Sequence, residues 1–202
     1  SFILTSTNNG VCNERSDTLL VTMTGIPTVN AGFDFTFCAN NADIPLQGYV
    51  SNGTTTGFWT TNGSGTFVPD SAQVNAMYIP SNGDTANHSV TLTLTSTGAC
   101  INISDAVTYT ITPAPKADAG LDDTVCANNS NALLTGNVFG TTTFGQWTST
   151  GGGTFFPNNT SMSVTYTPSA TEISSGMATV ILVSTFNGNC FSTKDTVRVN
   201  IL

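Results

Sequence analysis

The sequence predicts an all-β protein built as tandem β-sandwich repeats, and three observations lead to this prediction. Apolar and polar residues alternate with period two along several segments, as they do in strands that bury one face. Pairs such as Asn52-Gly53 and Asn187-Gly188 separate these segments and favour tight turns, because both residue types tolerate positive φ. Finally, a set of motifs recurs at a fixed spacing, which is typical of a tandem array.

The clearest alternation lies in two segments of the first repeat, residues 90–95 and 107–111. Their counterparts in the second repeat are residues 178–183 and 197–201. Threonine fills many of the polar positions, which keeps β propensity high without adding charge. Because no segment shows convincing helical periodicity, we expect strands throughout.

The repeat is defined by motifs that return 88 residues later, as Cys38-Ala39-Asn40-Asn41 does at Cys126-Ala127-Asn128-Asn129. An incomplete third copy opens the chain, where Leu4, Cys12 and Asp17 match a pattern found near the end of each full repeat. Prolines at 27, 113 and 115 interrupt strand pairing at the junctions. We therefore expect residues 1–26 to be the C-terminal strands of a truncated preceding repeat, followed by repeats at 27–115 and 116–202.

Composition excludes two classes of partner. Only 8% of residues are charged, against roughly 25% in ordinary soluble domains. The net charge of −8, from 12 acidic and 4 basic residues, argues against nucleic acid, whose phosphates attract basic surfaces. No stretch approaches the roughly 18 apolar residues of a membrane helix, so we expect no membrane insertion by this segment.

Five cysteines at repeat-equivalent positions predict an oxidising compartment and structural disulfides. Two pairings fit the repeat. One joins Cys38 to Cys100 and Cys126 to Cys190 within repeats and leaves Cys12 alone, whereas the other joins Cys12 to Cys38 and Cys100 to Cys126 across the linkers. We favour the first, because a proline-bearing joint between two separately packed units should hold the second set of partners apart.

Candidate metal and catalytic sites are sparse. Calcium is the one metal considered, because Asp34 and Asp122, with Asp118 and Asp123 nearby, lie just past the linkers, where carboxylates could stiffen a joint. Simple solvated turns are the favoured interpretation, so no cofactor is expected. The single His88 has Gly176 at the equivalent position, and no convergent set of acids, bases or nucleophiles is visible. The chain is therefore not expected to be an enzyme.

The assembled motifs resemble a known repeat type. Ala31-Gly32-x-Asp34, the Cys-Ala-Asn-Asn motif, Trp59-Thr60 and Gly65-Thr66-Phe67-x-Pro69 are similar to the immunoglobulin-like, PKD-like repeats of giant surface adhesins of gliding bacteria. The resemblance covers nearly the whole chain. It implies immunoglobulin-like sandwiches, type IX secretion and a long filament displayed outside the cell on its surface. It also implies that other parts of the full protein contact an external surface or polysaccharide and the motility machinery.

The resemblance also implies O-glycosylation of Asp-Ser/Thr-aliphatic triplets. The acceptors would be Thr18, Ser71, Thr85, Thr124 and Thr196.

Function follows from these expectations. Trp59 and Trp147 could serve as sugar-stacking platforms, but an apolar strand position in both copies favours core tryptophans, as immunoglobulin domains have. The leading hypothesis is a non-catalytic structural or adhesive module of a gliding-motility adhesin. The alternatives are a carbohydrate-binding or spacer module of a secreted hydrolase, and a protein-binding receptor array.

Overall fold

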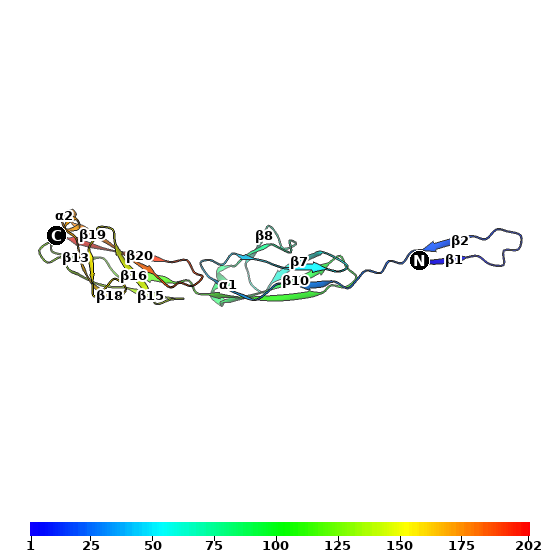
Figure 1. Ribbon diagram of the computed structural model, residues 1–202, viewed down its shortest axis with the longest axis horizontal. Coiled ribbons are helices and arrows are strands. Elements are labelled where there is room, and N and C mark those ends of the chain that lie inside the picture. The colour runs from blue at the N-terminus through cyan, green and yellow to red at the C-terminus, as the bar shows by residue number, and fades with distance from the viewer.

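The computed structural model describes all 202 residues and shows an elongated molecule. Two β-sandwiches lie end to end, and a β-hairpin extends beyond the first of them at the N-terminal end (Figure 1). We call the sandwich that contains strands β3 to β11 module 1 and the one that contains β12 to β20 module 2. This arrangement places the ends of the sandwiches, rather than their faces, in contact.

Module 1 has one large sheet, in which the strand order is β4-β11-β10-β7 and β4 runs parallel to β11. A three-stranded sheet of order β5-β9-β8 and the pair β3-β6 form the rest of the sandwich. The strands are β3 (Thr28–Asn30), β4 (Phe35–Cys38), β5 (Ile44–Pro45), β6 (Tyr49–Ser51), β7 (Thr56–Thr61), β8 (Thr66–Val68), β9 (Met77–Ile79), β10 (Ser89–Thr97) and β11 (Ser104–Thr112).

Module 2 repeats this topology. Its large sheet has the order β13-β20-β19-β16, again with its first strand parallel to its second, and β14-β18-β17 and β12-β15 complete the sandwich. The strands are β12 (Lys116–Asp118), β13 (Asp123–Val125), β14 (Ala132–Thr135), β15 (Asn137–Phe139), β16 (Gly145–Ser149), β17 (Thr154–Phe156), β18 (Ser163–Thr167), β19 (Met177–Ser184) and β20 (Lys194–Ile201).

The predicted alternation corresponds to burial in both modules. Along β10, every second residue from Val90 to Leu94 is fully buried, while the threonines between them reach the surface. The four predicted segments lie inside β10, β11, β19 and β20, so the all-β prediction is confirmed.

Each module has its own hydrophobic core. Each core contains 13 buried residues, and the two sets share no member. Trp59 belongs to the first core and Trp147 to the second, with exposed fractions of 1% and 0%. Both tryptophans are core residues of their modules.

The N-terminal hairpin has the geometry of the last two strands of a module. β1 (Phe2–Thr5) pairs with β2 (Ser16–Leu19) so that Leu4 lies opposite Asp17. The same register joins Leu94 to Asp105 and Leu182 to Asp195 in the modules. Leu4 is 79% exposed, whereas Leu94 and Leu182 are fully buried, because the hairpin has no second sheet packed against it.

Two short helices were not predicted. α1 (Asn82–Asn87) and α2 (Ala170–Ser175) have six residues each, fewer than two turns, so they leave no periodic pattern in the sequence. Another Asn-Gly pair, Asn82-Gly83, begins α1. No helix of the structure is long and apolar enough to cross a membrane.

Candidate functional site

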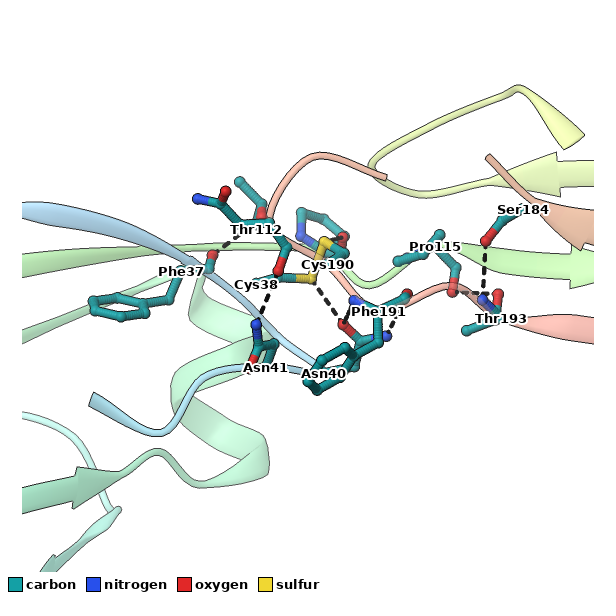
Figure 2. Close-up of a disulfide and its surroundings, with 12 residues drawn as sticks. Phe37, Cys38, Asn40, Asn41, Thr112, Pro115, Ser184, Cys190, Phe191 and Thr193 are labelled. Atoms are coloured by element: carbon teal, nitrogen blue, oxygen red, sulfur yellow. Dashed lines mark hydrogen bonds between the residues drawn. A yellow bond between two sulfur atoms is a disulfide. The ribbon is translucent and has the colours of Figure 1, made fainter. Parts of the chain in front are cut away.

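The most distinctive feature of the molecule is the joint between the two modules. There the loop between β19 and β20 of module 2 reaches the end of β4 in module 1 (Figures 1 and 2). At this point Cys38 and Cys190 form a disulfide across 152 residues of sequence, with their Cα atoms 5.1 Å apart. The modules are therefore connected covalently in two places, by the linker through Pro113 and Pro115 and by this disulfide.

This disulfide corrects both pairings considered from the sequence. Neither Cys38–Cys100 nor Cys126–Cys190 forms, and neither does Cys12–Cys38 nor Cys100–Cys126, because Cys12, Cys100 and Cys126 are free. The partners that the proline-bearing joints were expected to hold apart do stay unpaired, but the bond that crosses the joint, Cys38–Cys190, belongs to neither pairing.

The parallel pairing of β4 with β11 explains why the favoured pairing fails. Cys38 is opposite Thr112, the last residue of β11, while Cys100 is in the loop before the first residue of that strand. Nine strand residues span about 30 Å, far beyond the roughly 4.4–6.8 Å that separates bonded cysteine Cα atoms. The same argument separates Cys126 from Cys190, since β13 is parallel to β20 and its last residue, Val125, is opposite Ile201.

Hydrogen bonds from two asparagines accompany the disulfide. The side chain of Asn40 accepts a bond from the backbone N–H of Phe191 at 3.1 Å and donates one to the Phe191 carbonyl at 3.0 Å. Asn41 donates to the carbonyl of Asn189 at 3.1 Å. Figure 2 shows these side chains beside the disulfide, directed at the loop that bears Cys190. Module 1 thus holds the backbone on both sides of Cys190.

The linker is fixed to the same loop. The hydroxyl of Thr193 donates to the carbonyl of Pro115 at 3.1 Å, and the backbone N–H of Thr193 donates to the Ser184 hydroxyl at 2.9 Å. The Cys190 sulfur lies 3.8 Å from the Pro113 carbonyl oxygen. Linker, loop and strand end therefore form one connected unit.

Sequence reasoning found the motif at this joint but missed its role. The signal was the retention of Asn40 and Asn41, directly after Cys38, as Asn128 and Asn129 after Cys126. Two amide side chains that follow a cysteine are suited to hydrogen bonding with a backbone segment, because each amide has both a donor and an acceptor.

Each module also contains one buried carboxylate, which the sequence analysis did not single out. Asp84 in α1 and Glu172 in α2 are 2% and 4% exposed, and each completes a capping box with the serine that precedes its helix. Asp84 accepts hydrogen bonds from the Tyr78 hydroxyl at 2.9 Å, from the Ser81 N–H at 2.9 Å and from the Ser64 N–H at 3.0 Å. These bonds connect helix, loop and core in one network.

The network shifts the pKa of its members in opposite directions. Burial alone would raise the pKa of the Asp84 carboxyl, but the hydrogen bonds from Ser81, Ser64 and Tyr78 hold it below its ordinary value. The same balance lowers the pKa of Glu172. Burial, together with the adjacent Glu172, raises the pKa of the Tyr166 hydroxyl to about 12. These donors are fixed within the module, which is the arrangement of a structural network.

The tryptophans are not available as sugar platforms. Besides being buried, the indole N–H of Trp59 donates to the Val74 carbonyl at 3.1 Å, and that of Trp147 donates to the Ser161 carbonyl at 3.0 Å. Both faces and the polar edge of each ring are used inside the module.

The aspartates considered for calcium accept hydrogen bonds from backbone N–H groups. Asp34 accepts from the Thr108 N–H and Asp122 from the Arg198 N–H, both at 2.8 Å, which attaches the chain before β4 or β13 to the neighbouring long strand. Asp118 and Asp123 accept from nearby backbone N–H groups at 3.0 and 2.7 Å. No group of three or more His, Cys, Asp or Glu side chains is arranged to hold a metal ion.

The remaining candidate residues occupy varied surroundings. Thr18, Thr124 and Thr196 are exposed strand residues, whereas Ser71 and Thr85 are half-buried. The Thr85 hydroxyl donates to the Asn82 carbonyl at 2.9 Å within α1. His88 caps α1 with a left-handed backbone, φ 59°, and Gly176 does the same for α2 with φ 75°. The exchange of His for Gly between repeats is thus a matter of helix termination.

Solved structures share this fold at low sequence identity. The insect immune protein hemolin is 11% identical over 99% of this chain and 55% of its own, with a TM-score of 0.50. Extracellular domains 3–5 of Drosophila OTK are 10% identical over 87% of this chain and 62% of theirs, with a TM-score of 0.47. Domains I67–I69 of titin are 10% identical over 89% and 66%, with a TM-score of 0.43.

The chain spans between about half and two thirds of the length of these three structures. No protein-family model matches the chain, and no curated protein sequence matches it. At these identities the likeness concerns the fold alone, which is an all-β, immunoglobulin-like sandwich present in tandem.

Proposed function

We propose that this chain is a tension-transmitting segment of an extracellular stalk, a non-catalytic structural and adhesive rod of immunoglobulin-like modules. The single observation that carries the proposal is the Cys38–Cys190 disulfide between modules. Domains of one chain are expected to move relative to each other unless their interface is large, and this joint instead has a second covalent connection and three hydrogen bonds. Such a joint suits a part that must stay extended.

The disulfide also determines how tension passes through the molecule. When the chain is pulled from its two ends, force travels along the backbone to Cys38, crosses the disulfide to Cys190 and continues to the C-terminus. The residues between the two cysteines carry no tension while the bridge is intact. Most of both cores is therefore shielded from pulling.

The location and the biological setting are part of the proposal. A structural disulfide is stable in an oxidising compartment, which supports an extracellular location. The motif resemblance supports a cell-surface adhesin of the gliding-motility type, exported by the type IX route, whose other regions bind an external surface or polysaccharide and the motility machinery. The tryptophan platforms on which the carbohydrate-binding alternative depended are buried, so that alternative has lost its main support.

Single-molecule force spectroscopy tests the transmission of tension through the disulfide. The chain is pulled from its ends in oxidising buffer and again as the Cys38→Ser/Cys190→Ser variant. We expect complete unfolding of the variant to release about 500 Å more contour length than the oxidised chain, because 152 residues at roughly 3.5 Å each become extensible.

The matched control is Cys100→Ser/Cys126→Ser, which should extend as the unchanged chain does because those cysteines are free. Equal contour lengths for the oxidised chain and the Cys38→Ser/Cys190→Ser variant would overturn the proposal.

A further inference from the structure

Three cysteines remain free after Cys38 and Cys190 have paired, and each occupies one of the two positions that this disulfide uses. Cys12 and Cys100 lie in loops equivalent to the loop of Cys190, and Cys126 follows β13 as Cys38 ends β4. All three are exposed. We use "cysteine loop" for residues 6–15, 96–103 and 184–193, and "strand-end cysteine" for Cys38 and Cys126.

The cysteine loops are closed in the same way in all three copies. A serine at the start of each loop makes two hydrogen bonds with the residue at the end of the loop. The serine N–H donates to the carbonyl of that residue, and the serine hydroxyl accepts from its N–H. The pairs are Ser6 with Arg15 at 2.8 and 3.0 Å, Ser96 with Ile103 at 2.9 and 2.9 Å, and Ser184 with Thr193 at 2.9 and 2.9 Å.

Each module's cysteine loop also lies against the linker that leads into that module. The Cys190 sulfur is 3.8 Å from Pro113, and the Cys100 sulfur is 3.8 Å from the Thr24 hydroxyl. Cys100 is therefore held at the start of module 1 as Cys190 is held at the start of module 2.

The strand-end cysteines match equally well. The Asn41 N–H donates to the Cys38 carbonyl at 2.9 Å, and the Asn129 N–H donates to the Cys126 carbonyl at 2.9 Å. The residue after each cysteine is bound to the end of the neighbouring long strand. The Ala39 N–H donates to the Thr112 carbonyl at 2.9 Å, and the Ala127 N–H donates to the Leu202 carbonyl at 2.7 Å. The two sites differ in exposure, since Cys38 is fully buried beneath module 2 and Cys126 is exposed.

We propose that Cys126 is one half of a second inter-module disulfide, whose other half is the cysteine loop of a further module of this kind docked on the end of module 2. Asn128 and Asn129 bind the backbone of that loop as Asn40 and Asn41 bind the loop of Cys190. By the same geometry, Cys100 receives the strand-end cysteine of a module docked at the start of module 1. The occupant is a module of the same repeat type, because the equivalent surface of module 1 is occupied by module 2, which is such a module.

The bond requires an oxidant. The two thiols lose two protons and two electrons to a low-molecular-weight disulfide such as oxidised glutathione, by thiol–disulfide exchange through a mixed disulfide, and two glutathione thiols are released. The inference goes beyond the proposed function, because it assigns reactive partners to cysteines that the Cys38–Cys190 joint does not use.

A three-module chain tests the assignment. A second copy of residues 113–202 is fused after Leu202, with Ser192→Ala in that copy so that its cysteine peptide differs in mass. The protein is oxidised in a glutathione buffer and digested with pepsin at low pH, where disulfides do not exchange, and the linked peptides are identified by mass spectrometry.

We expect two bonds, Cys38 to Cys190 and Cys126 to the Cys190 equivalent of the added copy. Cys126 that remains open to alkylation, or that pairs with Cys100, would overturn the assignment. If Cys38–Cys190 still formed in that case, the proposed function of the joint would be supported, and only the proposal of a second inter-module disulfide would be overturned.

A variant of the same chain distinguishes docking from chance encounter of thiols. Asn128→Ala/Asn129→Ala should lower the effective concentration of Cys126 and its partner about tenfold, measured as the ratio of reduced to oxidised glutathione at half-oxidation. The control is Asn137→Ala, an exposed residue of β15, which should leave the ratio unchanged. An unchanged ratio in the double variant would contradict docking of the loop by the asparagines.

Discussion

At the scale of single residues, each module depends on a buried acid. Asp84 and Glu172 differ in length, yet each accepts a bond from a core tyrosine hydroxyl and completes a capping box. The tyrosines, Tyr78 and Tyr166, are fully buried, so their hydroxyls need an acceptor inside the module. A carboxylate from the adjacent short helix supplies it, and this explains why a chain with so few charged residues retains an acid at both positions.

The buried acids predict a loss of stability in acid. Because the folded pKa of Asp84 and of Glu172 is lower than the ordinary values of 3.8 and 4.5, each carboxylate stabilises the folded state fully above about pH 5. That contribution is lost as the pH falls through the folded pKa. We expect the free energy of unfolding, measured by urea titration followed by tryptophan fluorescence, to decrease steadily below about pH 4.5.

Glu172→Gln should remove part of this dependence and lower the stability of module 2 by about 2 kcal/mol at pH 7, the scale of one hydrogen bond to a charged group. Asp43→Asn, at an exposed position, is the control and should change neither quantity. An acid profile that is the same for Glu172→Gln and the unchanged chain would contradict this role.

At the scale of elements, close approach between a strand and a core tryptophan explains one glycine in each module. A Cβ atom added at Gly136, which lies between β14 and β15, would be 2.6 Å from Cζ2 of Trp147, and one added at Gly48 would be as close to the Trp59 ring. Real Cβ atoms do not approach other atoms so closely, and a packed indole ring has no room to move. The glycines thus set how near the second sheet lies to the tryptophan.

Gly136→Ala should therefore destabilise module 2 by about 1–3 kcal/mol, the usual cost of overpacking a core. Thermal unfolding followed by near-ultraviolet circular dichroism of the tryptophans measures the effect. The control is Thr124→Ala, at an exposed strand position. A glycine such as Gly152 would be a poor control, because its positive φ would strain an alanine. A stability equal to that of the unchanged chain would show that the ring can shift.

At the scale of the whole molecule, the direction of one short strand determines the architecture of the joint. Because β4 runs parallel to β11, both Cys38 and the linker leave module 1 at the same end. Module 2 is therefore attached at two neighbouring points, which limits bending and twisting between the modules. The exposed strand-end cysteine of module 2 then lies at the far end of the rod, where the same attachment can be made again.

Small-angle scattering measures the rigidity of the joint. We expect Cys190→Ser to broaden the distribution of interatomic distances and to decrease the radius of gyration, because the modules can bend about the remaining linker. Cys126→Ser should scatter like the unchanged chain, since its thiol is free. Superimposable curves for Cys190→Ser and the unchanged chain would mean that the hydrogen bonds of Asn40 and Asn41 alone hold the joint.

Much of the fold could be predicted because it depends on local patterns. Alternation along residues 90–95 reports directly on which side chains face a core. The tryptophans were recognised in the same way, from an apolar strand position that recurs in β7 and β16. The short helices escaped prediction, because six residues are too few to show a period, and their capping boxes were the only available signal.

By itself, the sequence determined that the chain is all-β, that it repeats, and which face of the alternating segments is apolar, since these properties depend on side chains close together along the chain. Only the tertiary structure decided which cysteines meet. That choice depends on the parallel register of β4 against β11 and on the contact between module ends, which join residues 152 positions apart. The spacing of cysteines in the sequence does not specify at which end of a sandwich a strand finishes. Cys38 lies next to the linker only because β4 runs parallel to β11 and ends at the same end of module 1.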